Sequence, residues 1–362
     1  MKQQDGPVRD DADPVDGEGD EGRGRARVTI YDVAREVGVS PSTVSRAFSR
    51  PGRVSSETSR RVHDVAERLG YRSEQLHRLP SPTRTRVVAL AVSDITNPFY
   101  FGIIRGAEKA AADNDFSLLV ADARESAEEE RRMLARHLPL VDGLIVTSSR
   151  LSDTDIRGLA RKVPVVVLNR RVPGLPCVLP DTPRGIRRAV EHLATLGHTR
   201  IGYVAGPGAS WADGSRWRAV REACMELSLT DVRVGPVTPT LAGGRGAAQD
   251  VVGRGLTAVI AYNDMVAVGL LRGLEALGAE VPGDVSVVGF DNTLPADLVG
   301  LTTVAQPVTL LGETAGRHVI GMATGQVEQR EQLSVLPVEL RVRESTGPVR
   351  DARGTGPPRR SG

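Results

Sequence analysis

Aromatic residues, cysteines, lysines and long apolar runs are all scarce in this chain. Aromatic residues make up 3% of the 362 positions, so any cluster of them is informative. The two cysteines, Cys177 and Cys224, fit no CxxC pattern and predict buried free thiols rather than a disulfide or a metal site. No stretch approaches the ~18 apolar residues of a membrane-spanning helix, and residues 1–25 lack the apolar core of a secretory signal. We therefore expect a cytoplasmic protein without a membrane partner.

Motifs of catalysis are missing as well. The chain has no GxSxG, HExxH or P-loop pattern, and its six histidines lack the spacing of metal ligands. Gly206 and Gly208 follow an apolar run, but the third glycine of a dinucleotide fingerprint is absent. We therefore expect no enzyme activity, no cofactor, and no catalytic or metal site. An enzyme acting on a sugar or nucleoside and a secreted sugar-binding protein are the alternatives, which a kinetic screen and cell fractionation would distinguish.

Charge is distributed unevenly along a chain whose formal net charge is only +2. Residues 1–26 contain four basic and eight acidic residues, whereas residues 27–86 contain twelve arginines and six acidic residues. A basic block in a nearly neutral chain indicates a polyanionic partner for that block alone. The acidic residues 1–26 and the tail 344–362 are expected to be disordered. The 40% hydrophobic content suffices for buried cores between them.

The basic block predicts three short helices. Thr29 is followed three residues later by Asp32, which is a capping signal, and Gly38 suits the left-handed residue that ends a helix. Ser40 caps a second helix with Pro41 at its first position, where the missing N–H has no helical partner to lose. Two helices joined by a three-residue turn form a helix-turn-helix motif, whose second helix enters the major groove of DNA.

The second of these helices has one polar face. Its apolar residues point to one side, and the other side presents, at helical spacing, Ser42, Ser45, Arg46 and Ser49. Short hydroxyl side chains let the helix backbone approach DNA, and an arginine can reach a guanine or a phosphate. An ordinary three-helix subdomain with a solvated face would show the same periodicity, so the geometry alone leaves that alternative open.

The same segment resembles the DNA-binding headpiece of the LacI family of bacterial transcription regulators. The shared phrases are T-I-Y-D-V-A, G-V-S-x-x-T-V-S-R, V-S-x-x-T and L-G-Y, at residues 29–34, 38–46, 54–58 and 69–71. The resemblance implies that Pro41, Ser42 and Arg46 read bases. Because proline cannot donate a hydrogen bond, base choice should rest on Ser42 and Arg46. The resemblance also implies contacts with phosphates or neighbouring bases for Thr29, Ser40, Thr43, Ser45, Ser49, Arg53, Ser55 and Thr58.

The linker 73–85 departs from the family's pattern. In the family this stretch forms a hinge helix on operator DNA, and a leucine inserts into the minor groove. Here Pro80 occupies the leucine position and Leu79 lies one residue earlier, and a proline there can end the helix or change its register. Minor-groove insertion of Leu79 is therefore a hypothesis, which Leu79→Ala would test through operator affinity and DNA bending.

From Arg86 onward, short apolar runs alternate with amphipathic helices. The runs fall at residues 87–92, 117–122, 143–147, 164–169, 200–206, 233–237, 258–262 and 286–290. This alternation predicts parallel sheets covered by helices on both faces. The series restarts near residue 185, which indicates two lobes of similar size. Ligands of such sheets bind beyond the carboxyl ends of the strands, so two facing lobes form one cleft.

Polar residues collect where these strands end. Carboxylates, amides and a guanidinium group there can hold sugar hydroxyls or the edge of a base, although Asp and Asn at strand ends also cap the next helix. Trp211 and Trp217 flank Arg216, where we expect a helix to begin, and either ring could pack in a core. We favour Trp211 for the cleft, because it should lie in a loop and Trp217 in a helix.

This region resembles the sensor domain of the LacI family, which is like the periplasmic sugar-binding proteins. The matching phrases include D-I-T-N-P-F-Y, N-D-M-V-A-V-G and V-P-G-D-V-S-V-V-G-F-D-N, which begin at residues 94, 263 and 281. The resemblance implies ligand contacts at Asp94, Asn97, Phe99, Arg170, Arg216, Asn263, Asp264 and Asp291, to which we add Trp211. Asn169 and Ala219 replace residues usual in the family, which leaves the ligand's identity open.

The resemblance also implies three crossings between the lobes, near Val178, Val304 and Val335. The expected organisation is a disordered tail, an all-α helix-turn-helix headpiece, a hinge, a two-lobed α/β sensor domain like the periplasmic binding proteins, and a second tail, at 1–26, 27–72, 73–85, 86–343 and 344–362. Within the sensor domain, lobe 1 comprises about 86–178 and 305–334, and lobe 2 comprises about 179–304 and 335–343.

Together these features predict a transcriptional regulator, in our interpretation a repressor, that binds double-stranded operator DNA as a homodimer. Two recognition helices must enter successive major grooves about 34 Å apart, which demands a two-fold partner. A small effector between the lobes, a sugar or sugar derivative rather than a purine or nucleoside, would control operator affinity. No leucine heptads follow the sensor domain, which favours a dimer over a tetramer. The sequence leaves open the effector, the operator, and whether the effector induces or co-represses.

Overall fold

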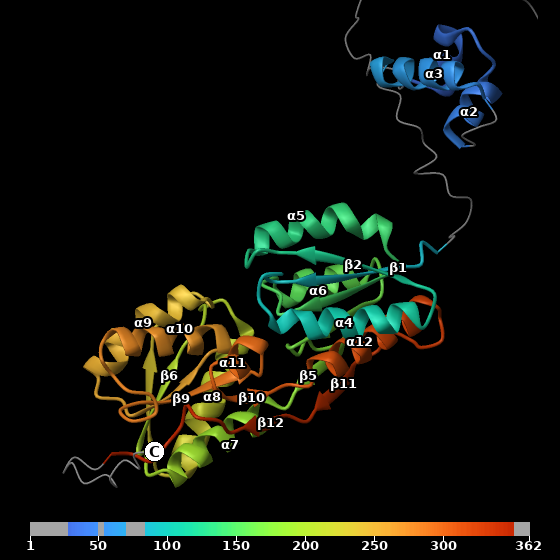
Figure 1. Cartoon of the computed structure of the whole chain (residues 1–362). Coiled ribbons are helices and arrows are strands. Elements are labelled where there is room, and N and C mark those ends of the chain that lie inside the picture. The colour runs from blue at the N-terminus through green and yellow to red at the C-terminus, as the bar shows by residue number, and fades with distance from the viewer. Residues whose placement is uncertain (1–27, 50–53, 70–83, 351–362) are drawn as a thin grey trace, which may run out of the picture. The chain divides into compact units, whose positions relative to one another are not determined.

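The computed structural model describes residues 28–49, 54–69 and 84–350, which fall into two compact units within Met1–Thr83 and Arg84–Gly362 (Figure 1). The described part of the first unit is all helical, and the second contains two sheets covered by helices. Among the described helices, none has both the length and the apolar composition needed to cross a membrane.

The first unit is a three-helix domain. Its helices are α1 (Ile30–Val37), α2 (Pro41–Ser49) and α3 (Ser56–Leu69). Their apolar stripes meet in a small core, to which the helices contribute one fully buried valine each, namely Val33, Val44 and Val62. Helices of two to four turns are marginal on their own, so this shared core is what stabilises them.

Local signals set the helix ends where the sequence predicts them. Asp32 accepts hydrogen bonds from the backbone N–H and the hydroxyl of Thr29 at 2.8 and 2.7 Å, which lowers the pKa of Asp32. Gly38 has φ 75° and ends α1 in the left-handed conformation. Ser40 Oγ accepts the Thr43 N–H at 3.2 Å and so begins α2. The predicted helix-turn-helix is therefore confirmed in its fold.

Lobe 1 of the second unit is built on a six-stranded parallel sheet in the order β11-β5-β4-β3-β1-β2. The strands are β1 (Val87–Val92), β2 (Ser117–Asp122), β3 (Gly143–Thr147), β4 (Val165–Leu168), β5 (Pro176–Pro180) and β11 (Gln332–Leu336). One face is covered by α4 (Phe99–Ala112) and α12 (Val308–Ala323). The other face is covered by α5 (Ala127–His137), a short 3-10 helix (Leu138–Leu140) and α6 (Asp153–Ala160).

Lobe 2 repeats this plan with the strand order β12-β10-β9-β8-β6-β7, in which β12 is antiparallel to β10. The strands are β6 (Arg200–Val204), β7 (Thr230–Val234), β8 (Ala258–Ala261), β9 (Ser286–Asp291), β10 (Thr302–Ala305) and β12 (Glu339–Arg341). One face is covered by α9 (Leu241–Gly253), α10 (Asp264–Ala276) and α11 (Leu294–Leu298). The other is covered by α7 (Thr182–Thr195) and α8 (Trp211–Glu226). The predicted two-lobed α/β fold is confirmed.

The described chain passes between the lobes three times, where β5 leads into α7, β10 into α12 and β11 into β12. These connections converge between the lobes (Figure 1). The predicted positions, Val178, Val304 and Val335, lie inside the strands that precede the crossings. Three short connections between two rigid sheets allow the lobes to rotate against each other, because few dihedral angles need to change.

Residues 344–350 are packed on lobe 2, so the prediction of a disordered tail from residue 344 is wrong there. Ser345 is buried, and its carbonyl accepts the Val287 N–H at 2.8 Å. Gly347 N–H donates to Ser286 Oγ at 3.0 Å. These partners lie about 60 positions earlier in the chain, so composition does not reveal them. Residues 351–362, 1–27 and 70–83 lie outside the described residues, and with them most of the predicted hinge.

Two element boundaries also differ from prediction. The helix expected from Arg216 begins at Trp211, because Ser210 caps it by accepting the Asp213 N–H at 3.3 Å. The strand expected at 233–237 ends at Val234 in β7, since Pro236 has no N–H to donate to a sheet. Strands β5, β10, β11 and β12 are absent from the predicted series, because short or edge strands carry a weak periodic signal.

One helix pair in each lobe packs with backbone against backbone. In lobe 1, α4 and α12 meet at Gly312, where a Cβ atom would lie 2.1 Å from Ile103 O. In lobe 2, α9 and α10 meet at Gly269, where a Cβ atom would lie 2.1 Å from Leu241 O. No side chain larger than hydrogen fits at either position without moving a helix.

Candidate functional site

The outward face of α2 is polar and exposed. Ser42 and Arg46 are exposed on it, whereas Val44 and Ala47 on the opposite face are buried in the headpiece core. Arg46 makes no hydrogen bond or ion pair with the other described residues. A guanidinium group that is free on a helix of this kind can donate two parallel hydrogen bonds to a guanine.

At the start of α2, and again at the start of α3, neighbouring hydroxyl groups are hydrogen-bonded to each other. Ser40 Oγ lies 2.8 Å from Ser42 Oγ and 2.9 Å from Thr43 Oγ1. Ser55 Oγ donates to Thr58 Oγ1 at 2.8 Å. Because a hydroxyl group both donates and accepts, these side chains can exchange their internal partners for phosphate oxygens with little rearrangement.

The remaining predicted DNA contacts divide into two groups. The first group is at least partly exposed, on α2 or just before α1, and consists of Pro41, Ser45 and Thr29. Outside the described residues are Arg53, Leu79 and the side chain of Ser49. The DNA contacts of this second group stay predictions.

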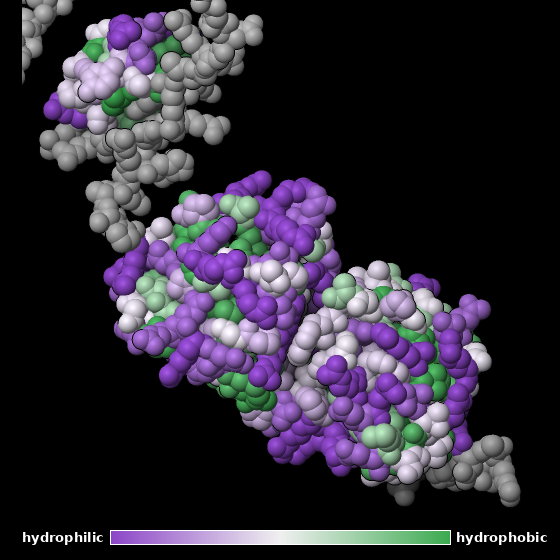
Figure 2. Space-filling model, turned by 180° about the vertical axis from the view of Figure 1, so that it is seen from behind, coloured by the Kyte–Doolittle hydropathy of each residue, from purple (hydrophilic) through white to green (hydrophobic). Residues whose placement is uncertain are grey.

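A closed cleft lies between the two lobes at the carboxyl ends of their parallel strands. Its walls are formed by Asn97, Phe99, Tyr100, Glu125, Ser148 and Asn169 from lobe 1 and by Ala212, Arg216, Pro239, Tyr262, Asn263 and Asp291 from lobe 2. The cavity between them is about 30 Å³, which is room for two or three water molecules at roughly 10–15 Å³ each. The lobes meet along a narrow crease (Figure 2). An organic ligand therefore enters only when the lobes move apart.

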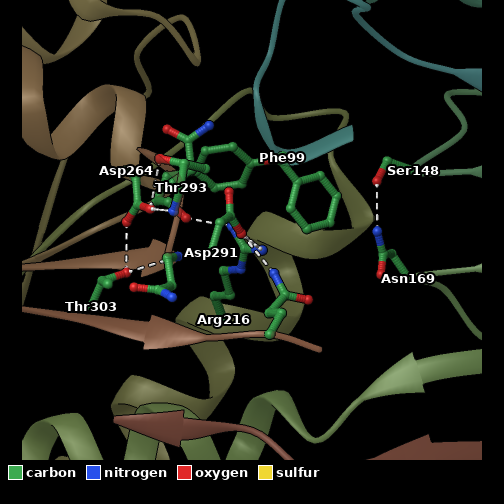
Figure 3. A network of polar contacts seen from close by, with 12 residues as sticks. Phe99, Ser148, Asn169, Arg216, Asp264, Asp291, Thr293 and Thr303 are labelled. Atoms are coloured by element: carbon green, nitrogen blue, oxygen red, sulfur yellow. Dashed lines mark hydrogen bonds and ion pairs between the residues drawn. The ribbon is translucent and has the colours of Figure 1, made fainter. Parts of the chain in front are cut away.

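Arg216 is the centre of the lobe 2 wall. Its side chain is 8% exposed, and its Cζ lies 3.9 and 4.9 Å from the ring centroids of Phe290 and Tyr262. Arg216 Nη1 donates to Tyr262 O, and Nη2 lies 3.4 Å from Asp291 Oδ1 (Figure 3). Gln306, in the crossing after β10, donates to the same oxygen of Asp291 at 2.6 Å. The site is thereby connected directly to a crossing between the lobes.

Two buried carboxyl groups face this arginine. Asp264 accepts hydrogen bonds from the N–H and hydroxyl of Thr293 at 2.7 and 3.0 Å and from the Thr303 hydroxyl at 2.6 Å (Figure 3). Burial raises the pKa of Asp264 to about 6 and the pKa of Asp291 to about 8, and Arg216 opposes both shifts. Asp291 has φ 124°, a strained conformation outside glycine. The surrounding contacts hold Asp291 in this conformation at the cleft.

The charged side chains near the lobe 1 wall are paired. Arg150 Nε donates to Glu125 Oε2 at 3.0 Å, and Arg150 Nη2 donates to the same oxygen. Arg170 donates to Leu151 O at 2.6 Å and forms an ion pair with Asp153. Both guanidinium groups are largely buried, with side-chain exposures of 6% and 11%. Arg150 is fully engaged by its carboxylate, whereas Arg170 Nε is buried and has no partner among the described residues.

Asn169 is the amide on this wall. It has φ 61°, and its Nδ2 lies 3.3 Å from Ser148 Oγ and 3.4 Å from Thr147 Oγ1 (Figure 3). Its Oδ1 is buried and has no hydrogen-bond partner among the described residues. Because a buried acceptor without a partner is costly, this oxygen is a candidate ligand contact.

The structure brings most of the predicted ligand contacts to the cleft. Its walls include Asn97, Phe99, Arg216, Asn263 and Asp291. A smaller recess beside it is lined by Arg170 and Trp211. Asp94 instead closes its own turn by accepting the N–H and hydroxyl of Thr96 at 2.9 and 2.6 Å. Asp264 is fully buried behind the wall.

The two tryptophans have different surroundings. Trp211 is 41% exposed at the first residue of α8, beside the recess. Trp217 stacks on Tyr203 at 5.7 Å and lies 5.8 Å from the Arg233 guanidinium. Trp217 therefore packs on lobe 2, and Trp211 lies at the cleft although it is helical rather than in a loop.

Seven wall residues are absent from the predicted ligand contacts, namely Tyr100, Glu125, Ser148, Asn169, Ala212, Pro239 and Tyr262. Ser148 and Tyr262 directly follow β3 and β8, so their places at strand ends were an available signal. Tyr100 and Glu125 reach the wall only through the packing of lobe 1.

Among the described residues, no cluster of His, Cys, Asp or Glu could hold a metal ion. Cys177 and Cys224 are buried free thiols, as predicted. Burial raises the pKa of both thiols, that of Cys224 to about 12, which keeps them protonated.

Comparisons with known proteins agree with this geometry. Residues 29–74 match the family described as bacterial regulatory proteins, lacI family, and residues 190–346 match the periplasmic binding protein-like domain. The chain is 32% identical over 336 residues to the HTH-type transcriptional regulator DegA of Bacillus subtilis (strain 168), covering 89% of this chain and 99% of DegA.

Two solved structures are similar over most of the chain. The complex of the transcriptional regulator CelR with cellobiose has a TM-score of 0.66 and 30% identity, covering 88% of this chain and 100% of CelR. The lac repressor dimer bound to operator and the anti-inducer ONPF has a TM-score of 0.67 and 27% identity, covering 88% of this chain and 99% of that chain. With its helix-turn-helix headpiece and two-lobed sensor domain, this chain belongs to the LacI family of bacterial transcription regulators.

Proposed function

We propose that this protein is a cytoplasmic repressor, not an enzyme, that binds operator DNA through α2 as a homodimer. A sugar or sugar derivative bound between the lobes controls its operator affinity. The observation that carries the proposal is the exposed, unpaired Arg46 beside Ser42 on the second helix of a helix-turn-helix.

The proposed DNA binding is supported by the headpiece side chains that are available to base edges and phosphates. Arg46 supplies the long cationic reach that a guanine requires, and Ser42 is short enough for close approach. The hydroxyls of Ser40, Thr43, Ser55 and Thr58 lie at helix starts, where side chains commonly contact the DNA backbone. One headpiece reads only half of a two-fold operator, so a second copy is required.

The effector half rests on the cleft. Amide, carboxyl and guanidinium groups converge there beside the ring of Phe99, and such a mixture suits a compound with an apolar face and several hydroxyls. The related regulator CelR has been solved with cellobiose. Because the cleft is closed, binding must be coupled to lobe movement, and the effector weakens DNA binding only by its preference for the non-binding state.

The test is operator binding by the full-length protein. Fluorescence anisotropy with DNA from the promoter region beside its own gene should give saturable, salt-dependent binding, and one sugar from a panel should change that affinity. Asp291→Ala should bind the same DNA and lose the sugar response, because Asp291 lies in the cleft and not in the headpiece. Absence of salt-dependent DNA binding would contradict the proposed function.

A further inference from the structure

We infer that the cleft accepts an uncharged polyhydroxyl compound and excludes phosphorylated or acidic sugars. This inference rests on the proposed function, because it narrows the chemical class of that same effector. It follows from the state of each guanidinium, carboxyl and amide group that borders the cleft in the described residues.

Every arginine that borders the cleft or its recess is already engaged. Arg216 is bound by Asp291 and the Tyr262 carbonyl, and Arg150 is bound by Glu125. Arg170 is held by Asp153 and two backbone carbonyls. A phosphate or carboxylate could pair with the Nη groups of these cations only by displacing the partner already there, although the Nε groups of Arg216 and Arg170 have no partner among the described residues. Displaced from Arg216, the buried Asp291 would lose its charged partner, which is unfavourable, whereas Glu125 and Asp153, with side chains 30% and 39% exposed, would lose an ion pair that water replaces in part.

The charge around Arg216 also disfavours an anion. Asp291 lies 3.4 Å from this guanidinium, Asp264 lies behind the wall and is bonded to Thr293 and Thr303, and burial raises the pKa of each carboxyl group. With one of the two carboxyl groups protonated, the cluster of Arg216, Asp264 and Asp291 is neutral, and loss of that proton makes it negative. Glu125 adds a further carboxylate on the opposite wall. Near neutral pH, the cleft therefore presents no net positive charge.

Helix N-termini attract anions, and two of those that border the cleft, the starts of α8 and α10, are capped. Ser210 Oγ accepts the Asp213 N–H at 3.3 Å at the start of α8. Asn263 Oδ1 accepts the Val266 N–H at 2.9 Å at the start of α10. Because these caps already bind N–H groups of the first turn, the helix ends have less to offer an anion.

The unsatisfied atoms instead match hydroxyl groups. Asn169 Oδ1 is a buried acceptor without a donor, and Arg216 Nε is a buried donor without an acceptor. A hydroxyl group can donate to the first and accept from the second. A doubly ionised phosphate or a carboxylate group only accepts, so the group that meets Asn169 Oδ1 must be a hydroxyl or another donor of the ligand. A polyhydroxyl compound is therefore the ligand class that satisfies both atoms.

The test compares matched ligands on the full-length protein at constant ionic strength. Thermal shift and calorimetric titration would use glucose with glucose 6-phosphate and gluconate, ribose with ribose 5-phosphate, galactose with galactose 1-phosphate and galacturonate, and inorganic phosphate alone. We expect the neutral sugar that binds to bind about tenfold or more tightly than its charged forms, a difference of ~1.4 kcal/mol. Inorganic phosphate should give no saturable stabilisation.

Glu125→Gln supplies the converse measurement. Removing this carboxylate leaves Arg150 with a neutral partner, so inorganic phosphate and the phosphorylated sugar should gain about tenfold in affinity relative to wild type. Glu128→Gln is the matched control, because Glu128 pairs with the exposed Arg132 on α5 and should leave every affinity unchanged.

Three outcomes would overturn the inference. The first is a charged sugar that binds the wild type more tightly than its neutral parent. The second is saturable binding of phosphate to the wild type, and the third is an unchanged preference in Glu125→Gln. Operator binding is measured in parallel, so failure of the DNA function would be seen separately from a wrong ligand class. If no probe of either kind bound, both the effector role and this inference would fall.

Discussion

Two arginines, one in the headpiece and one in the cleft, have opposite surroundings. Arg46 is exposed and unpaired among the described residues, and it can therefore offer all its donors to an external acceptor. Arg216 is 8% exposed and lies between two rings with its Nη groups engaged. Because its position is set by packing, it can orient a ligand without first being ordered.

Arg46→Ala should weaken operator binding by about 1–3 kcal/mol and relax base preference at one operator position. The physical reason is that alanine removes the guanidinium group and with it the hydrogen bonds to the base edge. Competition anisotropy against operators with single base changes measures both effects. Arg68→Ala, which removes an exposed arginine paired with Glu36, is the control. Equal discrimination between operator and random DNA by mutant and wild type would remove Arg46 from base reading.

Stability should fall as the pH rises from about 6.5 to 8, because burial raises the pKa of Asp291 to about 8. In this window the folded protein retains a proton that the unfolded chain, with an aspartate pKa of ~3.9, has already lost. Unfolding therefore releases a proton in this window, so raising the pH favours the unfolded state until the folded protein has also lost that proton. Thermal or urea unfolding across the window measures the slope, and Asp291→Asn should flatten it.

Buried histidines provide the check on this interpretation. Burial lowers the pKa of His192, His198 and His318. Their contribution therefore increases stability as the pH rises, and it is complete above about 6.5, the pKa of histidine in the unfolded chain. Below that pH a rise in stability that persists in Asp291→Asn belongs to them, and Asp264, whose pKa burial raises to about 6, contributes an opposing fall. An unchanged slope above it in the variant would show that Asp291 is not the titrating group.

At the scale of elements, the connection between cleft and fold runs through α12. This helix belongs to lobe 1 but follows a crossing from lobe 2, and the crossing contains Gln306, which donates to Asp291. The tight contact of α12 with α4 at Gly312 fixes the far side of that crossing. Movement of the lobes must therefore be absorbed in the crossings rather than between these helices.

Gly312→Ala should destabilise the protein by about 1–3 kcal/mol, since its methyl group would lie 2.1 Å from a backbone oxygen. Gly246→Ala on the exposed side of α9 is the matched control, because its methyl group would meet nothing within 4 Å. That change should stabilise by roughly 0.5–1 kcal/mol through helix propensity. Urea unfolding measures both. Equal effects of the two substitutions would contradict the close approach of α4 and α12.

At the scale of the whole molecule, the proposed mechanism needs two copies and two lobe arrangements. The cavity of about 30 Å³ represents the closed arrangement of the lobes. Each arrangement would favour a different separation of two headpieces on DNA, so an effector that prefers one of them shifts operator affinity by its differential binding.

Half-site spacing should therefore control operator affinity. Inserting about five base pairs, half a turn of the ~10.5-base-pair helix, between the two halves of a palindromic operator moves the second major groove to the opposite face. We expect affinity to fall toward that of a single half-site, measured by gel shift. Unchanged affinity with the insertion would show that one headpiece suffices and would contradict the dimeric mode.

Local chemistry by itself determined the headpiece and the class of the second unit. Thr29 with Asp32, Gly38 and Ser40 mark helix ends through contacts between residues close in sequence, and such signals are readable without a fold. The apolar runs that became β1, β3, β4, β6, β8 and β9 are buried strands with a strong pattern, and the run that became β2 is a half-buried edge strand. The polar residues after them were identifiable for the same reason.

Tertiary structure alone decided which of those polar residues face the cleft and with what charge. Asp94 and Asp264 lie within three residues of the ends of β1 and β8, and Asp291 ends β9, yet Asp94 closes a turn and Asp264 is buried behind the wall. The pairing of Glu125 with Arg150 joins residues 25 positions apart, and that of Asp291 with Gln306 joins 15. Such contacts depend on how sheets and helices pack, and packing is a property of the folded chain rather than of any short stretch of sequence.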